Sequence, residues 1–514
     1  MKADPEQALA APFGTIAGLI HLHAQQAPLR RALVQEDQVL TYAELDVHMD
    51  RVAAALQRDG VLPGEAIAIC SGTSIAYAVT YLGALRAGVV VAPLAPGATA
   101  ESLADMLHDA GARLLFTDRN VAEALGNQAA TVPRIALDES PAGRPWTQWL
   151  APQETKPQNA QVDAQWPFNI IYSSGTTGQP KGIVQPHGMR WAHVQRGATY
   201  GYGADTVTLL STPLYSNTTL VVFFPTLAYG GTVLLMGKFD ALAYLALASK
   251  ERVTHTMLVP VQYQRLMARA DFGDYDLSSF RIKFSTSAPF SAALKADVLQ
   301  RWPGGLVEFY GMTEGGGTCI LEAHLHPDKL HTVGRPAQGH DIRLINEDGR
   351  EVPPGEAGEV VGHSPGMMKG YHQRPEQTRE AEWFDPQGKR FIRTGDIGRF
   401  DADGFLALFD RRKDMIISGG FNIYPSDLEA VLRGHPAVHD AAVVGVPSEQ
   451  WGETPVAFVV RQPGQELAAD TLRLWANERV GKTQRLADLR YLDELPRSAI
   501  GKVLKRELRD LYRA

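Results

Sequence analysis

Glycines, hydroxyls and one lysine fill residues 173–182, which read SSGTTGQPKG. The stretch follows residues 168–172 (FNIIY), a mainly apolar run typical of a buried strand. Glycine allows close backbone approach, and backbone N–H groups and Ser/Thr hydroxyls donate hydrogen bonds, so phosphate oxygens are the expected ligand. The alternative is a flexible surface turn. It is not a Walker A loop, because Gly182 follows Lys181 and Pro180 prevents a helix from beginning in the loop.

A second group of reactive side chains lies at the end of a predicted strand. The sequence EFYGMTEG places Tyr310, Thr313 and Glu314 in and after this strand. The carboxyl ends of strands are where open parallel sheets bind ligands. An aromatic ring can pack on a purine, a hydroxyl can donate to a phosphate, and a carboxylate can hold Mg²⁺. These side chains therefore indicate a candidate nucleotide site.

Two further charged stretches lie closer to the end of the chain. Asp396 ends the sequence RTGD, and Arg411 lies in the sequence DRRKD. An aspartate carboxylate can accept hydrogen bonds from both hydroxyls of a ribose. Lys502 ends the sequence LPRSAIGK, on a Gly/Ser loop between a strand-like run and a predicted helix. Taken alone, this lysine has the pattern of a solvated surface residue.

Alternating helix and strand patterns must position these side chains. Apolar residues recur at helical spacing over residues 45–56, whereas residues 66–70 form a short apolar run typical of a buried strand. The same alternation returns in residues 242–259 and 292–310. Strands and helices that alternate in this way predict parallel sheets covered by helices.

The pattern changes in the last third of the chain. Residues 334–410 are rich in Gly, Pro and Asp and contain short strand-like runs, which predicts a β-rich subdomain. From residue 414 onward the chain reads as a compact α+β segment. We therefore predict an α/β fold with a large N-terminal domain over residues 1–412 and a small C-terminal α+β domain over residues 413–514.

Composition excludes several classes of protein. The 514 residues are 45% hydrophobic with a formal net charge of −7, which gives a nucleic-acid partner no support. The two cysteines, Cys70 and Cys319, are too few for a disulfide framework and are expected to be buried filler. No apolar run has the length of a membrane span, and we expect a cytoplasmic protein.

In their order along the chain, these motifs resemble those of the adenylate-forming superfamily. That superfamily includes acyl- and aryl-CoA synthetases, beetle luciferases and the adenylation domains of nonribosomal peptide synthetases (NRPS). Supporting stretches are VGRP at residues 333–336, SGGFNIYP at 418–425 and WGE at 451–453. The resemblance covers nearly the whole chain and is closest to free-standing CoA ligases of the 4-coumarate, benzoate and fatty-acid type.

The resemblance implies two half-reactions. A carboxylate attacks the α-phosphate of MgATP, which gives an acyl-adenylate and pyrophosphate, and CoA then displaces AMP. ATP, Mg²⁺ and CoA are thus the implied cofactor and cosubstrates. Thr177 and Glu314 are the implied metal ligands. The implied ATP- or AMP-binding residues are Ser173, Ser174, Gly175, Thr176, Thr177, Gly178, Lys181, Ser287, Ala288, Pro289, Tyr310, Gly311, Asp396 and Arg411; for Lys181 a solvated loop lysine remains the alternative.

The catalytic residues implied by the resemblance are Lys502, Thr313 and Glu314. Lys502 would bridge the incoming carboxylate and the α-phosphate, so the small domain must close on the large one. Lys413 corresponds to the hinge about which this mobile domain rotates between the half-reactions. Gly419 and Gly420 would then face CoA.

The acyl pocket is expected to involve Tyr215, Ser216, Thr286, Gly315 and Gly316. Ser216 stands where many relatives have histidine, and Thr286 stands where they have glycine, which would narrow the slot. The three consecutive glycines at 315–317 are expected to leave open space beside the nucleotide. No arginine in these segments is obvious as a partner for a second carboxylate. We therefore expect an aromatic or medium-chain monocarboxylate as the acid.

Other functions stay open at this point. A ligase that loads a phosphopantetheine carrier protein would share the first half-reaction. A nucleotide-binding paralogue without catalytic activity is disfavoured by the presence of Lys502, Glu314 and Asp396. The expected state of assembly is a monomer or a homodimer.

Overall fold

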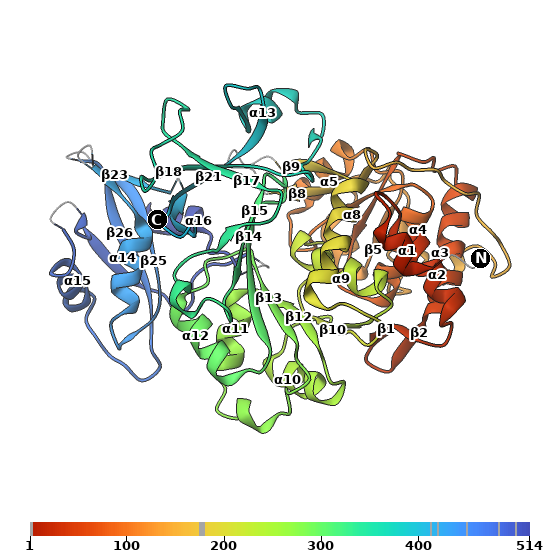
Figure 1. Cartoon of the computed structure of the whole chain (residues 1–514), viewed down its shortest axis with the longest axis horizontal. Helices are drawn as coiled ribbons and strands as arrows, with labels where there is room; N and C mark the ends of the chain where they lie inside the picture. Colours follow the sequence, from red (N-terminus) through yellow and green to blue (C-terminus); the bar gives the residue numbers. More distant parts are fainter. Residues whose placement is uncertain are drawn as a thin grey trace. The chain divides into compact units, whose positions relative to one another are not determined.

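The protein folds into two compact units, each of which is described by itself (Figure 1). The first unit comprises Met1–Leu330, Pro336–Asp341 and His363–Ile392, and the second comprises His331–Arg335, Ile342–Gly362 and Arg393–Ala514. The two units are defined by which residues pack together. They do not locate a hinge, so the predicted domain boundary after residue 412 stays a prediction. The computed structural model describes residues 4–173, 180–411, 414–418, 421–448, 451–481, 484–498 and 501–513.

A mainly parallel sheet of the first unit has the strand order β15-β14-β13-β12-β10-β11-β1-β2. All neighbouring strands from β14 to β1 are parallel, and β15 and β2 are antiparallel to their neighbours. The segments that follow β13 and β14 therefore leave the sheet at the same side. The strands are β1 (Arg31–Gln35), β2 (Gln38–Thr41), β10 (Val207–Leu210), β11 (Thr232–Leu235), β12 (His255–Leu258), β13 (Ile282–Ser285), β14 (Gly305–Gly311) and β15 (Thr318–Glu322).

A second sheet of the same unit has the order β19-β9-β8-β4-β3-β5-β6-β7. Its strands are parallel from β8 to β7, whereas β8, β9 and β19 pair antiparallel. The predicted α/β class with helix-covered, largely parallel sheets is confirmed. The strands are β3 (Ala66–Cys70), β4 (Val90–Pro93), β5 (Leu115–Thr117), β6 (Arg134–Ala136), β7 (Arg144–Pro145), β8 (Pro167–Ser173), β9 (Lys181–Pro186) and β19 (Gly370–Tyr371).

Helices with apolar faces fill the space around these sheets. The helical spacing in residues 45–56 becomes α3, which begins with a capping box between Thr41 and Glu44. The helices of this unit are α1 (Pro5–Ala10), α2 (Ile16–Gln26), α3 (Tyr42–Arg58), α4 (Ile75–Arg86), α5 (Ala100–Asp109), α6 (Arg119–Leu125), α7 (Trp146–Trp149), α8 (His187–Gln195), α9 (Asn217–Ala228), α10 (Ala241–Lys250), α11 (Pro260–Met267), α12 (Ala292–Arg301) and α13 (Pro375–Glu380), with 3₁₀ turns η1 (Arg196–Tyr200), η2 (Phe272–Asp274) and η3 (Pro327–Lys329).

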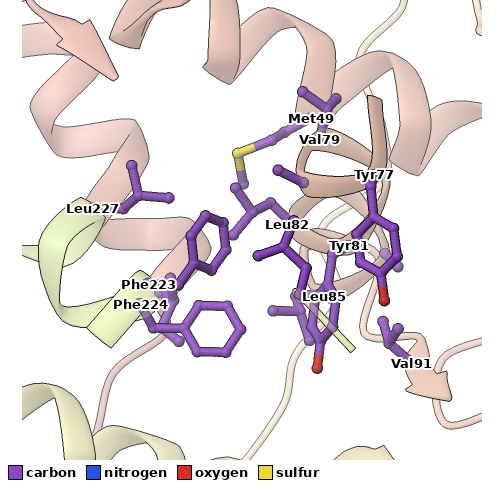
Figure 2. Close-up of a cluster of buried hydrophobic side chains, with 14 of the residues drawn as sticks. Met49, Tyr77, Val79, Tyr81, Leu82, Leu85, Val91, Phe223, Phe224 and Leu227 are labelled. Carbon is purple, nitrogen blue, oxygen red and sulfur yellow. The ribbon is translucent and has the colours of Figure 1, made fainter. Parts of the chain in front are cut away.

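The largest buried cluster joins α3, α4 and α9. Met49 of α3, Leu82 of α4 and Phe223 of α9 point toward one another, and each is fully buried (Figure 2). α3 and α4 pack closely because Gly83 has no side chain: a Cβ there would lie 2.5 Å from the Cβ of Val52. Burial of each large apolar side chain contributes roughly 1.5–3 kcal/mol. This core fixes α9, whose N-terminus carries part of the predicted acyl pocket.

The second unit is an α+β structure. Its sheet has the order β24-β23-β26-β25, with β27 parallel to β26. The predicted α+β character of the segment from residue 414 onward is confirmed by α14, β25 and β26. The elements are β22 (Leu406–Arg411), β23 (Ile416–Ser418), β24 (Phe421–Ile423), α14 (Pro425–Arg433), β25 (Val438–Ser448), β26 (Gly452–Arg461), α15 (Ala469–Asn477), β27 (Asp488–Tyr491) and α16 (Lys505–Arg513).

Several strands carry the chain from one unit into the other. β20 pairs with the first residues of β21 in the first unit, and β22 pairs with its later residues in the second. Both cysteines are buried and unpaired, as expected. Within the described residues no helix combines the length and the apolar character needed to cross a membrane. The remaining strands are β16 (Arg335–Pro336), β17 (Asp341–Ile345), β18 (Gly358–His363), β20 (Glu382–Phe384) and β21 (Arg390–Phe400).

Candidate active site

The glycine-rich stretch connects two antiparallel strands. Ser173 ends β8 and pairs with Lys181, the first residue of β9. The predicted strand before the loop is confirmed, and the strand after it explains why Pro180 is tolerated: no helix begins here. The predicted phosphate-binding positions Ser174, Gly175, Thr176, Thr177 and Gly178 lie outside the described residues, as does the side chain of Ser173.

Lys181 is held at the base of this hairpin. Its Nζ lies 5.2 Å from the centre of the Tyr371 ring, and its side chain is half-buried. Tyr371 belongs to β19, which pairs with β9, so the two residues come together across a short antiparallel contact. Lys181 is therefore not a fully solvated loop lysine, and its cation sits beside the glycine-rich connection.

Tyr371 links the hairpin to Glu314. Its hydroxyl donates a hydrogen bond to Oε1 of Glu314, with an O–O distance of 2.9 Å. Burial, together with the charge and hydrogen bond of Glu314, raises the pKa of Tyr371, so the phenol stays protonated as a donor. The sequence analysis missed the position of Tyr371 beside Glu314. Nothing in the linear sequence marks two residues 57 positions apart as partners.

The loop that carries Thr313, Glu314, Gly315 and Gly316 joins β14 to β15, and its base is the pair Gly311–Thr318. The carbonyl of Glu314 accepts a hydrogen bond from the Met368 N–H at 2.8 Å, and the carbonyl of Gly315 accepts one from the Ser364 hydroxyl at 2.6 Å. The segment before β19 thus holds the loop in place.

The expectation of open space at Gly315 is wrong. A Cβ on this residue would lie 2.2 Å from the carbonyl oxygen of Gly366 and 2.9 Å from Cε of Met189. Gly315 also has a φ of +74°, which disfavours a side chain. Glycine is needed here because backbone and Met189 fill the space, not because a substrate does.

A buried polar pair stands behind Thr313. The amide of Gln185 donates to the carbonyl of Thr313 at 2.7 Å, and its oxygen accepts a hydrogen bond from Nη2 of Arg190. Arg190 is 1% exposed, and burial lowers its pKa to about 10, so it remains charged at neutral pH. Among the described residues its Nε and Nη1 have no hydrogen-bond partner. The sequence analysis missed both residues, because in sequence Gln185 is part of a strand and Arg190 part of a helix.

Two of the predicted acyl-pocket residues have structural partners. The Thr286 hydroxyl donates to the carbonyl of Phe309 at 2.8 Å, so it lies against the neighbouring strand β14. Ser216 is buried and caps the N-terminus of α9 by accepting from the Thr218 N–H at 3.3 Å. Tyr215 is half-buried, and burial raises its pKa. The narrowing by Thr286 and the assignment of all five pocket residues stay predictions.

Ser287, Ala288 and Pro289 follow β13 at the same side of the sheet as the loop after β14. Ser287 adopts a φ of +79°, a conformation that is costly for a residue with a side chain. Its hydroxyl lies 2.6 Å from that of Thr218. Backbone strain that is stabilised by a specific contact is common at ligand-binding positions, and it supports the assignment of this segment to the nucleotide site.

Asp396 and Arg411 face each other in the second unit. They are paired residues of the antiparallel strands β21 and β22, next to a bulge. The Asp396 N–H donates to the Thr394 hydroxyl at 3.0 Å, and that hydroxyl donates to the carbonyl of Val360 at 2.9 Å. The structure thus brings together the two residues predicted to hold the ribose, although the side chain of Arg411 lies outside the described atoms.

Lys502 lies in a tight turn before α16. The Ser498 N–H donates to the carbonyl of Lys502 at 2.8 Å, and the Lys502 N–H donates to the Ser498 hydroxyl at 3.2 Å. Gly501 completes the turn with a φ of +77°. The hinge residue Lys413 and the predicted CoA-side residues Gly419 and Gly420 lie outside the described residues.

Magnesium would have to bind with few protein ligands. Within the described residues no group of three or more His, Cys, Asp or Glu side chains could hold a metal ion. Mg²⁺ usually keeps several waters and binds through one or two carboxylates and the phosphates of its substrate. The single carboxylate of Glu314, held by Tyr371, fits that mode of binding.

Comparisons with known proteins show the family of this chain. Residues 20–372 match the family described as AMP-binding enzyme, and residues 427–502 match the AMP-binding enzyme C-terminal domain. A feruloyl-CoA synthase from Amycolatopsis sp is 36% identical over 494 residues, which cover 95% of this chain and 96% of that protein. The fatty acid–[acyl-carrier-protein] ligase ScoC from Streptomyces coeruleorubidus is 32% identical over 512 residues, which cover 97% of this chain and 96% of that protein.

A solved structure of a CoA synthetase is similar to this chain over almost its whole length. The o-succinylbenzoate CoA synthetase from Bacillus subtilis, in complex with its acyl-adenylate intermediate, matches with a TM-score of 0.83 and 30% identity. The match covers 96% of this chain and 98% of that one. The same enzyme has also been solved with ATP and a magnesium ion.

Proposed function

The chain belongs to the AMP-binding enzyme family and is an AMP-forming acid–CoA ligase that uses ATP, Mg²⁺ and CoA, and from this premise we propose the roles of its residues and the class of its acid. The observation that carries the proposal is the contact chain from Lys181 through Tyr371 to Glu314. It joins the glycine-rich hairpin to the loop after β14. A cation and a carboxylate are thereby held beside the connection proposed to receive the phosphates.

The first half-reaction requires two anions to meet. The acid's carboxylate must approach the α-phosphate of ATP, so catalysis consists mainly of positioning and of neutralising charge. We assign the β- and γ-phosphates to residues 173–178 with Lys181, and the α-phosphate to Thr313. Glu314 is the assigned ligand for Mg²⁺, which would supply charge neutralisation at the phosphates.

Thr313 is well suited to its role because its backbone is fixed. Gln185 holds its carbonyl, and the buried guanidinium of Arg190 holds the amide of Gln185 in the orientation that donates. A fixed backbone keeps the Thr313 side chain aimed at one point, which is what stabilisation of a transition state requires.

The second unit is proposed to supply the remaining groups. Asp396 and Arg411 hold the ribose, for which their paired position on β21 and β22 is the support. Lys502 bridges the carboxylate and the α-phosphate oxygens in the first half-reaction. Rotation about Lys413 then removes Lys502 and turns the side that carries Gly419 and Gly420 toward CoA. In a Lys413→Pro variant the second half-reaction should slow more than the first.

The proposed acid is an aromatic or medium-chain monocarboxylate. Relatives named for feruloyl and o-succinylbenzoyl groups support the aromatic class. Tyr215 and the ring of Tyr310 are the apolar surfaces assigned next to the acid and the adenine. The alternative acceptor is a phosphopantetheine carrier protein, which the similarity to the fatty acid–[acyl-carrier-protein] ligase keeps as a second candidate. We propose the cytoplasm as the compartment, since ATP and CoA are both available there.

A two-stage assay tests this proposal. Pyrophosphate release is measured with a panel of aromatic acids, C2 to C16 fatty acids and dicarboxylates, and the active acids are then offered CoA or a carrier protein bearing phosphopantetheine. We expect release with aromatic or C6–C10 acids and a thioester with CoA. Activity confined to acetate, to C16 acids or to dicarboxylates would contradict the acid class. A thioester with the carrier protein alone would replace CoA as the acceptor.

A further inference from the structure

One face of α8 runs alongside the loop between β14 and β15. Met189, His193 and Arg196 are spaced i, i+4 and i+7, so they lie on the same side of the helix and of its extension into η1. Met189 locates this face, because its Cε lies 2.9 Å from the position of a Cβ on Gly315. His193 and Arg196 therefore lie on the same side of this helical segment as the residue that meets Gly315.

His340 contacts the end of the same loop at Thr318. Its Nδ1 accepts a hydrogen bond at 2.9 Å from the N–H of Thr318, the residue that closes the loop opposite Gly311. Because Nδ1 is an acceptor, the neutral ring carries its proton on Nε2. Burial, with a smaller contribution from the charge of Arg196, lowers the pKa of His340 to about 4, so the imidazole is neutral at pH 7.

Arg196 is the charged member of this cluster. Burial lowers its pKa, and its charge in turn lowers the pKa of His193, for which burial is the main cause. Among the described residues the guanidinium of Arg196 has neither a hydrogen-bond acceptor nor an ion-pair partner, although its side chain is half-buried. Nδ1 of His193 is likewise buried without a hydrogen-bond partner. A buried polar atom without a partner, such as Nδ1 of His193, is unfavourable unless a ligand or a water molecule meets it, and the half-buried guanidinium of Arg196 remains open to a ligand.

Aromatic rings surround the cluster on the sheet side. Tyr200, which follows Arg196 in η1, packs edge-on against Phe284 of β13 at 5.2 Å and Phe309 of β14 at 5.8 Å between ring centres. Glu322 acts electrostatically on Tyr200. The cluster thus combines one cation, two neutral imidazoles and apolar rings beside the strands whose ends carry the proposed acyl pocket.

We propose that Arg196, with His193 and His340, binds the end of the acid that is remote from the reacting carboxylate, and that it donates hydrogen bonds to an oxygen there. This rests on the proposed function and requires a distal oxygen acceptor on the acid. A phenolic oxygen keeps the proposed monocarboxylate, whereas a second carboxylate would replace it with a dicarboxylate. The sequence analysis considered arginines within the acyl-pocket segments only, and Arg196 lies outside them. Arg196 lies at the end of a helical segment that is distant in sequence from the acyl-pocket segments.

The experiment compares acids of matched shape with and without the oxygen. The first pair is para-hydroxycinnamate and para-methylcinnamate, and the second is adipate and heptanoate. The readout is kcat/KM for pyrophosphate release. In the wild-type protein the oxygen-bearing acid of at least one pair should be preferred by about 10- to 100-fold, the effect of a hydrogen bond to a charged group. The pair that shows the preference identifies the oxygen as phenolic or carboxylate.

Arg196→Met should reduce that preference to about twofold or less, whereas Arg196→Lys should keep part of it. Arg113→Met, at an exposed arginine, is the matched control and should keep the full preference. Melting temperatures show whether each variant is folded. No preference in either pair, or a preference that survives Arg196→Met, would overturn the inference. Absence of pyrophosphate release with every acid would instead contradict the proposed function.

Discussion

The loop between β14 and β15 and the turn that carries Lys502 are held in opposite ways. In the loop, the carbonyls of Thr313 and Glu314 accept hydrogen bonds from Gln185 and Met368, residues from other parts of the first unit. In the turn, Lys502 is held by Ser498 of the same turn, through its carbonyl and its N–H. The backbone of Thr313 and Glu314 is thus positioned by segments distant in sequence, and the backbone of Lys502 by a residue close to it in sequence.

This difference suits the roles proposed for the loop, which stays beside the nucleotide, and for Lys502, which acts in only one half-reaction. A group that must stay beside the nucleotide benefits from partners on the surrounding elements, which fix it in the first unit. A cation that must be present in one half-reaction and removed in the other can depend only on contacts that move with it. The predictions below test whether each region depends on the contacts named, from the largest expected effect to the smallest.

Replacement of the loop carboxylate should have the largest effect. Glu314→Gln removes the charge assigned to Mg²⁺ but keeps an oxygen that can accept from Tyr371, so folding should be preserved. Adenylate formation, measured by pyrophosphate exchange, should fall by about 100-fold, as for other losses of a key electrostatic group. Glu347→Gln, at an exposed position, is the control and should be unaffected. A Glu314→Gln enzyme with normal exchange would show that the loop is not the metal-binding region.

Removal of the phenol that holds Glu314 should have a smaller effect. Tyr371→Phe deletes one hydrogen bond to a carboxylate, which is worth roughly 1.5–3 kcal/mol, so adenylate formation should slow by about 10-fold or more. The concentration of Mg²⁺ needed for half-maximal rate should rise as well. Tyr244→Phe removes a buried hydroxyl that donates to Thr256, away from this loop, and should leave the Mg²⁺ requirement unchanged. The same requirement in both variants would contradict a positioning role for Tyr371.

A third variant tests the support behind Thr313. Gln185→Glu can still accept from Arg190, but its carboxylate cannot donate to the Thr313 carbonyl. Adenylate formation should fall by about 3- to 10-fold, because one buried hydrogen bond is lost, while thioester formation from added acyl-adenylate changes little. An equal loss in both half-reactions would mean that the substitution disturbs the whole unit. Thermal melting distinguishes that case from a local shift of Thr313.

The smallest effect concerns stability and pH. Burial lowers the pKa of His187, the first residue of α8, to about 4, whereas an unfolded histidine titrates near 6.5. Below pH 6.5 the unfolded chain therefore binds more protons than the folded one, and this contribution to stability falls as pH drops toward 4. Between pH 7 and pH 5, His187→Phe should lose about 2 kcal/mol less of its unfolding free energy than the wild type. Parallel pH profiles from urea unfolding would contradict the burial of a neutral His187.

Local patterns in the sequence predicted the elements well. The apolar spacing of residues 45–56 became α3, and the apolar run at residues 66–70 became β3. Helical spacing and short buried runs are properties of neighbouring residues, so they can be read without knowledge of the fold. The strand before the glycine-rich stretch and the strand before Tyr310 were predicted for the same reason.

Contacts between distant segments could not be predicted in this way. Tyr371 beside Glu314 and Gln185 beside the Thr313 carbonyl depend on the order of strands in two sheets, which no local pattern encodes. Arg196 was not singled out, because its proposed binding role is argued from its surroundings in the fold, which is a property of packing. The open space expected at Gly315 was wrong because the carbonyl of Gly366 fills it.

The central claim is that the cation of Lys502 acts on nucleotide held by the first unit in one half-reaction only. The most direct measurement compares the two half-reactions of Lys502→Ala, with pyrophosphate exchange for the first and CoA thioester formation from synthetic acyl-adenylate for the second. We expect exchange to fall by about 100-fold or more and thioester formation to stay within about threefold of the wild type. Equal losses in both, or full exchange without the lysine, would contradict the account.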